Sequence, residues 1–448
     1  MFTKVRLKNF RLFDEIEFDL TNRNNVPKHL VVVYGENGAG KSNLLSAFVL
    51  LNELLATMDV RDVYEDFLNR SAIFNDETFE MDLRQQLLSN MRDMKAIIGD
   101  CRMVGSEEPV LAEFEFSVGG NIGKYSIEFG ETEIIHERLE YKLSKRRGLY
   151  FDCSSEGVYI NNVIFQNREF LGDIKATARR FWGKHSLLAI VFHEMNDKST
   201  SYGWDTISDN FADILGEFTT LSSHLGIGAR RWNKISSPIA VLEQADEGQL
   251  QRNNEYQLDI CELVFSQFFS AINSDIERAY YRRSYNDNKI AYQLYFKKLI
   301  AGVYRDIPFS KESTGNHQLL SVLCYLLSAC FGGTVIIDEA DSGIHDVLFQ
   351  KVFQELIPSI NGQVIMTTHN TMLMEADFAR DSTYIISEDD HGCRSVRNIT
   401  SYEKRTFANN NIRNKYLNGE YGGLPHVRSI DFDSLLQLLS RKMTNTES

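Results

Sequence analysis

The chain has 448 residues, of which 43% are hydrophobic and 25% charged, so it is long enough to form two or three structural units with an ample core. Its formal net charge of −14 argues against a protein that wraps nucleic acid around its whole surface. The six cysteines form no CxxC pair, and neither a signal peptide nor an apolar run long enough to span a membrane is found, so we expect a cytoplasmic protein without disulfides, zinc or membrane contact.

Two strands are expected at the start of the chain, because residues 5–13 and 15–20 alternate between apolar and polar side chains across a tight turn. Residues 29–34 form a continuous run rich in β-branched side chains, which predicts a buried parallel strand. Residues 42–51 are predicted to form a helix. Between this strand and this helix lies Gly35-Glu36-Asn37-Gly38-Ala39-Gly40-Lys41-Ser42, which matches the phosphate-binding pattern G-x-x-x-x-G-K-[ST].

This octapeptide has the composition that phosphate binding requires. Its glycines allow the chain to wrap an anion with backbone N–H groups, and the helix that follows directs its positive end at the same anion. We expect Lys41 to reach the β- and γ-phosphates of ATP and Ser42 to hold a magnesium ion. A glycine-rich turn that arose by chance would lack the buried strand before it and the helix after it. The expected nucleotide contacts are Gly35, Asn37, Gly38, Gly40, Lys41, Ser42 and Asn43.

The remainder of the first lobe, which we take as residues 1–165, is predicted to be a helical stretch followed by an antiparallel sheet. Residues 52–108 are polar and helical in pattern. Alternation then predicts several strands, with Gly119-Gly120-Asn121 as a hairpin turn between the first two. The expected strands are 111–116, 124–129 and 134–139, with one or two more short strands within 148–165.

Residues 166–284 are predicted to form a compact helical insertion between two lobes, since apolar residues recur at helical spacing without sustained heptads. The candidate helices are 171–194, 206–222 and 254–281. Pairs of adjacent arginines are more typical of a solvated surface, but they could build a local basic patch for nucleic acid. These pairs are Arg146-Arg147, Arg179-Arg180, Arg230-Arg231 and Arg282-Arg283.

The second lobe, residues 285–448, begins with predicted strands at 290–296 and 303–309. An apolar helix is expected to follow as far as residue 330, and Ser313 in front of it is a suitable N-cap. The start of this helix is therefore a second helix end that could bind an anion.

Two further apolar strands end in polar residues that could bind a metal or take part in catalysis. Residues 334–337 are followed by Asp338 and Glu339, which we expect to hold magnesium through water and to polarise the attacking water, respectively. Residues 363–368 are followed by His369. An Asp-Glu pair after a strand often only caps the next helix, and a lone histidine is more often structural. The prediction of a nucleotide site therefore depends on the order and spacing of all these motifs together.

In this order and at these intervals, the motifs resemble the ATP-binding-cassette class of ATPase heads, which includes chromosome-maintenance and recombination-repair ATPases. The resemblance implies an α/β fold, namely a two-lobed ABC-type P-loop ATPase head with an antiparallel first-lobe sheet and a helical insertion. It implies an ATPase that uses ATP and Mg²⁺. Lys41, Glu339 and His369 would be its catalytic residues, His369 being the switch histidine, and Ser42 and Asp338 would be its metal ligands.

By the same resemblance, Ser313-Thr314-Gly315 corresponds to the signature motif and Ser342-Gly343-Ile344-His345 to the loop that contacts the partner head. Ser313 and Gly315 would then complete the nucleotide site of a neighbouring subunit, so that ATP bridges the heads of a homodimer or a higher oligomer. The chain departs from the family pattern at Thr314, where a glycine is usual. No counterpart of the magnesium-coordinating glutamine of the first lobe is recognisable.

The C-terminal part resembles the stand-alone AAA-type ATPases of bacterial abortive-infection and anti-phage systems. The residues that carry this resemblance are 368–371, 385–392 and 416–425. The similar proteins are the RloA and AbiL ATPases, the ATPase subunit of the PARIS system and the ATPase part of the overcoming-lysogenisation-defect proteins. In such systems the ATPase is typically paired with a separately encoded effector protein, often a Toprim-type nuclease.

Three functions are therefore weighed. The first is an ATP-hydrolysing sensor or regulatory subunit of an anti-phage system, which controls a separate effector and responds to DNA or a phage protein. The second is a DNA-repair or recombination ATPase of the chromosome-maintenance type that acts directly on DNA. The third is a nucleotide-dependent scaffold that hardly turns over.

A nuclease site within the chain itself is less favoured. A Toprim site needs a glutamate and a D-x-D pair to hold magnesium. The sequences Glu388-Asp389-Asp390 and Asp431-Phe432-Asp433 supply acidic groups. However, the segment after His369 is short for a Toprim domain, and Asp431 is better placed to cap a helix at 434–439.

Overall fold

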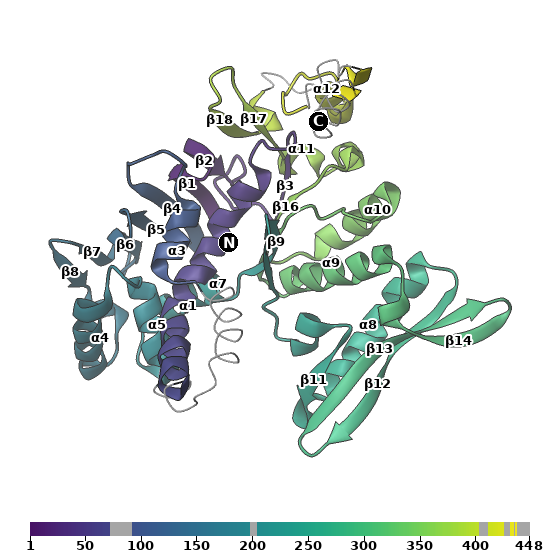
Figure 1. Ribbon diagram of the computed structural model, residues 1–448, viewed down its shortest axis with the longest axis horizontal. Coiled ribbons are helices and arrows are strands. Elements are labelled where there is room, and N and C mark those ends of the chain that lie inside the picture. Colours follow the sequence, from purple (N-terminus) through teal and green to yellow (C-terminus); the bar gives the residue numbers. More distant parts are fainter. Residues whose placement is uncertain (72–91, 198–203, 403–410, 425–430, 434, 437–448) are drawn as a thin grey trace, which may run out of the picture.

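The computed structural model describes residues 1–448 except 72–91, 198–203, 403–410, 425–430, 434 and 437–448. Within these residues the fold is α/β and contains two seven-stranded sheets and one four-stranded sheet (Figure 1). The prediction of an α/β fold with an antiparallel sheet in the first lobe is thereby confirmed.

The first sheet is antiparallel throughout and is built almost entirely from neighbouring segments of the chain. Its strands bury alternate residues, which is the pattern that the sequence predicts for a sheet with one face on the core. Gly119 and Gly120 form the predicted hairpin turn, with φ values of 51° and 72° that favour glycine. In spatial order the strands are β2 (Phe13–Asp19), β1 (Phe2–Phe10), β4 (Val110–Val118), β5 (Asn121–Phe129), β6 (Ile134–Lys142), β7 (Arg147–Ser154) and β8 (Gly157–Ile160).

The second sheet has five parallel strands in its centre and one antiparallel strand at each edge. Its central strands are buried along their whole length, as expected when both faces of a parallel sheet are covered. In spatial order the strands are β10 (Arg230–Lys234), β9 (Ser222–Ile227), β15 (Thr334–Ile337), β16 (Gln363–Thr367), β3 (Leu30–Tyr34), β17 (Thr383–Glu388) and β18 (Arg394–Asn398).

Two hydrophobic cores lie on opposite faces of this parallel sheet. Val31 and Val33 of β3 point into one core, which also contains helix α1 (Lys41–Ser71) and the inner face of the antiparallel sheet. Leu30 and Val32 point into the other core. The remaining helices are α3 (Met94–Cys101), α4 (Arg168–Phe181), α5 (Leu187–Asp197), α7 (Asp209–Thr219), α8 (Tyr256–Ile272), α9 (Thr314–Cys330), α10 (Asp346–Leu356), α11 (Ala379–Ser382) and α12 (Ile412–Leu417).

Helix α1 contains the one segment among the described residues, Lys41–Asp66, that is long and apolar enough to cross a membrane by length and composition alone. Charged and polar residues interrupt it, so it is not an uninterrupted apolar run in the sequence. In its most apolar window, 67% of the residues are buried inside the protein, and its apolar side chains belong to the core between the two large sheets. The apolar composition of α1 is therefore explained by its central position.

The third sheet stands apart from the other two (Figure 1). Its long central strand is β13 (Lys289–Ile300), which pairs with β12 (Ile276–Asn286) on one side. On its other side it pairs first with β11 (Glu247–Gln251) and then with β14 (Val303–Pro308). Helix α8 packs against β12 and covers one face of this sheet.

Among its described residues, the segment predicted to be a helical insertion, 166–284, contains helices α4, α5, α7 and α8 but also strands β9, β10 and β11 and most of β12. The helix expected over 254–281 ends at Ile272, because from Ile276 the chain alternates between buried and exposed residues, as a strand does. The helix expected over 171–194 is divided into α4 and α5. The segment therefore contributes β9 to the parallel sheet, and its description as an all-helical unit is wrong, while the boundaries at 165 and 285 remain predictions.

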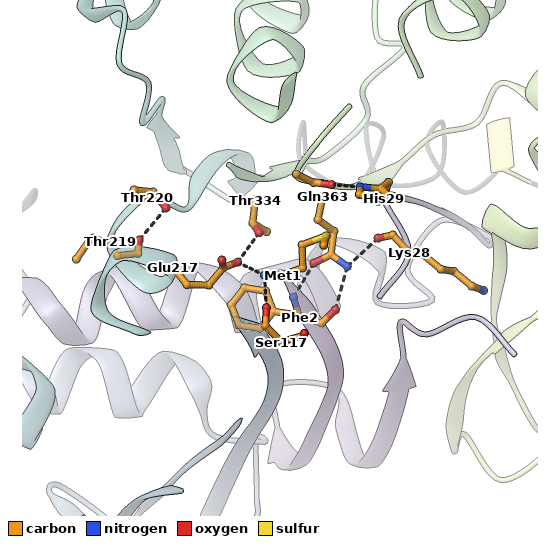
Figure 2. A network of polar contacts seen from close by, with 12 residues as sticks. Met1, Phe2, Lys28, His29, Ser117, Glu217, Thr219, Thr220, Thr334 and Gln363 are labelled. Atoms are coloured by element: carbon orange, nitrogen blue, oxygen red, sulfur yellow. Dashed lines mark hydrogen bonds and ion pairs between the residues drawn. The ribbon is translucent and has the colours of Figure 1, made fainter. Parts of the chain in front are cut away.

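A polar network joins the first strand of the antiparallel sheet to the amino ends of the parallel strands (Figure 2). The buried side chain of Gln363 at the start of β16 accepts a hydrogen bond from the N–H of Phe2 at 2.8 Å. Its amide nitrogen donates to the carbonyl oxygens of Phe2 and Lys28, both at 3.0 Å. The carboxylate of Glu217 accepts from the Thr334 hydroxyl at 2.9 Å and from the backbone nitrogen of Met1 at 2.5 Å. This network therefore fixes the two large sheets relative to each other.

Candidate functional site

Three loops meet at the carboxyl edge of the parallel sheet, opposite the network of Figure 2. Strand β16 lies between β15 and β3, and all three run in the same direction. The segments that follow these strands therefore leave the sheet side by side. They are the phosphate-binding loop after β3, Asp338 after β15 and His369 after β16.

The phosphate-binding loop requires glycine at several positions. Gly38 and Gly40 have φ values of 86° and 104°, in the left-handed region that favours glycine. A Cβ atom on Gly35 would lie 2.4 Å from Cγ2 and 2.7 Å from the carbonyl oxygen of Ile386, so only glycine allows strand β17 to approach so closely. Asn37 and Gly38 are exposed at the tip, whereas Ser42 and Asn43 are half-buried in the first turn of α1.

Lys41 is only 7% exposed, and its ammonium group donates to the carbonyl oxygens of Gly35 at 2.8 Å and Glu36 at 3.1 Å. Among the described residues it forms no ion pair with a carboxylate. Burial lowers the pKa of Lys41, while Asp338 and Glu339 act in the opposite direction and favour the charged form. A buried cation without a carboxylate partner, held at a glycine-rich loop, fits the requirement for an anionic phosphate.

Thr367 links the Asp338 side chain to the Glu339 backbone. Its hydroxyl donates to Oδ1 of Asp338 at 2.6 Å and accepts from the backbone N–H of Glu339 at 2.8 Å. Glu339 has a φ of 49°, in the left-handed region that non-glycine residues rarely adopt. Such strain is retained where neighbouring contacts enforce it, as the hydrogen bond from Thr367 does here. The positions of Asp338 and Glu339 are thus set by β16 as well as by their own strand.

His369 is exposed at the same edge, and its backbone N–H lies 3.4 Å from Oδ1 of Asp341. Its imidazole makes no hydrogen bond or ion pair with any residue that the structure describes, so the ring is available to a ligand. The structure therefore brings Lys41, Asp338, Glu339 and His369 to one sheet edge, as the sequence predicts. Thr367 and Asp341 were not identified from the sequence, because a threonine that ends an apolar strand looks like an ordinary strand residue.

Ser313 and Gly315 lie at the start of helix α9, and no hydrogen bond or ion pair among the described residues joins them to the loop 35–42. The Ser313 hydroxyl accepts from the N–H of Asn316 at 3.3 Å, so the predicted N-cap is present. A Cβ atom on Gly315 would lie 3.1 Å from the carbonyl oxygen of Gly343. The start of α9 is therefore packed against the loop 342–345. These two segments are the ones that the resemblance assigns to contacts with a partner head.

Glu388 at the end of β17 and Asp389 directly after it have structural roles. Glu388 forms an ion pair with Arg394 across the β17–β18 hairpin at 2.6 Å. Asp389 accepts the N–H groups of His391 and Cys393, both at 2.9 Å, and these bonds lower its pKa. Within the described ranges, no group of three or more acidic, histidine or cysteine side chains is arranged to hold a metal. Most of the helix expected at 434–439 lies outside those ranges, as do residues 72–91 of the stretch 52–108 and Pro425 of the tail.

A magnesium ion bound with ATP fits the side chains at this edge. The Ser42 hydroxyl and the Asp338 carboxylate are the hard oxygen donors that Mg²⁺ prefers, and magnesium characteristically takes its other ligands from phosphate and water. When bound, the ion neutralises negative charge on the phosphates. Glu339 is the carboxylate that could accept a proton from an attacking water. The edge can therefore bind a magnesium nucleotide and offer a general base beside it.

Comparison with known proteins gives one family and several solved structures. Residues 30–375 match the family described as "AAA domain, putative AbiEii toxin, Type IV TA system", whereas no curated protein matches the chain. An SMC head bound to the C-terminal winged-helix domain of ScpA shares 15% identity over 88% of this chain and 96% of that chain, with a TM-score of 0.43. The SMC head domain from Thermotoga maritima shares 16% identity over 89% and 98%, with a TM-score of 0.39. A Pyrococcus furiosus Smc head bound to the C-terminal domain of ScpA shares 12% identity over 88% and 95%, with a TM-score of 0.40.

The family match covers well over half of the chain and includes the phosphate-binding loop, the Asp338-Glu339 pair and His369. It extends from the start of β3 to Glu375, so it spans the strands that form the edge described above. The chain belongs to this family of AAA domains.

Proposed function

We propose that the chain binds ATP with Mg²⁺, hydrolyses it, and acts as the regulatory subunit of an anti-phage system that controls a separately encoded effector. The observation that carries the ATPase part is the carboxyl edge of the parallel sheet, where the buried Lys41 lies among the described residues without a carboxylate partner and Thr367 bonds the Asp338 carboxylate and the Glu339 backbone. The family description, "AAA domain, putative AbiEii toxin, Type IV TA system", is compatible with a role in abortive infection.

Each residue then has a defined role in hydrolysis. Lys41 leaves the carbonyl oxygens of Gly35 and Glu36 and binds the β- and γ-phosphates. Ser42 and Asp338 would hold a magnesium ion, which neutralises phosphate charge when bound, and Glu339 would accept a proton from the attacking water. His369, whose imidazole is exposed at the same edge, contacts the γ-phosphate or the water.

The proposal includes a shared site in a head-to-head dimer. The γ-phosphate gains donors on its far side if the start of α9 from a second subunit faces it, and a helix N-terminus supplies them. Gly315 packs against Gly343, so the signature segment and the loop 342–345 of one subunit would approach the partner together. ATP would then hold two heads in contact, and hydrolysis would release them.

Mixing variants tests the shared site. In a mixed dimer of a Lys41→Ala chain and a Gly315→Asp chain, one composite site is intact, so the mixture should regain part of the ATPase activity that each variant lacks. A mixture of Lys41→Ala with Glu339→Gln is the matched control, since both changes lie in the same half-site and cannot complement each other. Recovery in the first mixture alone supports shared sites. Absence of recovery in the first mixture, while mixed dimers form, contradicts them.

The regulatory role is tested in cells with the adjacent open reading frame co-expressed. We expect phage protection or triggered toxicity to require both proteins and to be lost with Lys41→Ala. Protection by this chain alone would contradict control of a separate effector, and ATPase activity that depends on DNA without any effector would favour the repair function instead. Protection that survives Glu339→Gln but not Lys41→Ala would identify a nucleotide-dependent scaffold.

A further inference from the structure

The four-stranded sheet has one open face. Its inner face is packed with α8 and buries Ala279, Tyr281, Leu294 and Phe296. The main contacts of β12 and β13 with other described elements run to neighbouring strands, α8 and the short helix 309–311. On the other face, alternate residues of β12 and β13 carry aromatic and basic side chains. We call these residues, Arg278, Tyr280, Arg282, Tyr295 and Lys297, the tyrosine–arginine face.

Planar side chains form a continuous row across this face. Tyr280 and Tyr295 are directly opposite each other on adjacent strands, and their rings are stacked with centroids 5.8 Å apart and planes 29° apart. The guanidinium of Arg282 lies over the Tyr295 ring at 4.0 Å, and that of Arg278 lies over the Tyr280 ring at 5.2 Å. Tyr304 of β14 extends the row, since Lys297 lies over its ring at 5.2 Å. Arg278, Arg282 and Tyr304 are exposed, whereas Tyr280 and Tyr295 are half-buried.

Of the three cations on this face, only Arg278 lacks a carboxylate partner among the described residues. Arg278 is exposed, forms no ion pair with any described residue, and lies directly opposite Lys297, and like charges in opposite positions destabilise a strand pair. Lys297 has a carboxylate partner in Glu277 at 2.9 Å, and Arg282 has one in Asp306 at 3.4 Å. In a chain with a net charge of −14, an unpaired cation beside a second cation marks a place suited to an anion.

Adjacent arginines in the sequence are separated by this sheet. Arg282 belongs to the tyrosine–arginine face, whereas Arg283 lies on the inner face and forms ion pairs with three acidic residues near α8, Glu255, Asp259 and Glu262. Arg282 therefore contributes to the tyrosine–arginine face, whereas Arg283 contributes to the packing of α8 on the sheet. The strand alternation, and not the arginine doublet, builds the patch.

We propose that the tyrosine–arginine face binds an unpaired strand of nucleic acid. Bases would stack on the Tyr280 and Tyr295 rings, and phosphates would lie against Arg278, Arg282 and Lys297. A duplex hides the faces of its bases, so it cannot use the rings, whereas an unpaired strand spread over an open sheet can. The inference does not rest on the proposed ATPase function, because none of these residues belongs to the nucleotide site.

The test uses the full chain with fluorescent 20-nucleotide strands of dT and of rU, and a mixed-sequence 20-base-pair duplex, in anisotropy titrations at several salt concentrations. We expect at least one of the single strands to bind more tightly than the duplex. The double variant Tyr280→Ala/Tyr295→Ala should weaken that binding at least tenfold, since base–aromatic stacking is lost. The variant Arg278→Gln/Arg282→Gln should reduce the slope of log K against log salt by about 1.4, since each phosphate contact contributes about 0.7 for a single strand.

The matched control is Tyr285→Ala. Tyr285 is an exposed tyrosine of the same strand, but it lies on the opposite face beside Arg252 and Glu255. Its removal should leave binding unchanged. Thermal unfolding of each variant distinguishes a lost contact from a lost fold. Arg278 and Arg282 are exposed, so Arg278→Gln/Arg282→Gln should fold normally even if Tyr280→Ala/Tyr295→Ala does not. Equal or tighter duplex binding, no binding of either strand, or equal effects of Tyr285→Ala and Tyr280→Ala/Tyr295→Ala would overturn the proposal.

Discussion

The two edges of the parallel sheet have opposite characters although the same strands form them. At the amino edge, the buried amide of Gln363 makes three hydrogen bonds to backbone groups of Phe2 and Lys28. At the carboxyl edge, Lys41 is buried with only loop carbonyls as partners, and Glu339 has a strained backbone. One edge satisfies its polar groups within the chain, and the other leaves them for a ligand.

This difference separates an edge that stabilises the fold from an edge that serves a ligand. A fully hydrogen-bonded buried amide holds two sheets in one arrangement, so β3, β15 and β16 present their loops at fixed positions. The strained and poorly compensated groups at the opposite edge lower stability, and such groups are retained when they act on a ligand. Substitutions at one edge should therefore change stability without chemistry, and substitutions at the other should do the reverse.

The largest expected effect is that of Glu339→Gln at the carboxyl edge. An amide cannot accept the proton of the attacking water, so the turnover number for ATP should fall by roughly 10²–10⁴ while ATP still binds. Steady-state phosphate release and nucleotide binding measured on the same preparation test this. Turnover within about twofold of the parent chain would remove Glu339 from the role of base.

The next effect is that of Gln363→Leu at the amino edge. The substitution leaves the N–H and C=O of Phe2 and the C=O of Lys28 without partners, which should lower the free energy of unfolding by about 3 kcal/mol. Urea denaturation measures the change. Gln350→Leu is the matched control, because Gln350 is half-buried and makes a single hydrogen bond to the carbonyl of Met372, so the expected loss is about 1 kcal/mol. Equal losses in the two variants would show that the amino edge has no special role.

The third effect is that of Lys41→Ala. Loss of a charge-assisted contact to phosphate should weaken ATP binding by about 1.5–3 kcal/mol, which is roughly 10- to 150-fold. Stability without nucleotide should not fall, because the substitution removes a cation that burial disfavours. Calorimetric titration with ATP and thermal unfolding of the free chain measure the two quantities. Unchanged affinity would contradict the phosphate-loop interpretation.

The sequence predicts the antiparallel sheet and the phosphate loop well because both depend on residues that are close along the chain. The strand 222–227 illustrates what it cannot predict: it is short, contains a glycine and two serines, and pairs with β15 more than 100 residues later. The hydrogen bonds of Gln363 to Phe2 connect residues 361 positions apart, and no local pattern encodes them. Asp338, Glu339 and His369 could be placed on strand ends, but the coupling of Asp338 and Glu339 through Thr367 follows only from strand order.

The smallest expected effect is that of Lys28→Met. Lys28 lies before strand β3, at the edge opposite Lys41. Lys28, at the amino edge, donates to the Tyr384 hydroxyl at 2.8 Å, and burial lowers its pKa from 10.5 to about 8. Between about pH 8 and pH 10.5 the unfolded chain therefore binds more protons at this residue than the folded chain, so its contribution to stability rises with pH in that window. The variant Lys28→Met lacks this rise. Over that window, the free energy of unfolding of the parent should therefore increase relative to that of the variant. Urea denaturation at pH 7.5 and pH 10 measures this. The same pH dependence of stability in the two proteins would show that Lys28 is not desolvated. Nucleotide affinity is the control, and it should be the same in both because Lys28 lies at the edge away from the phosphate loop.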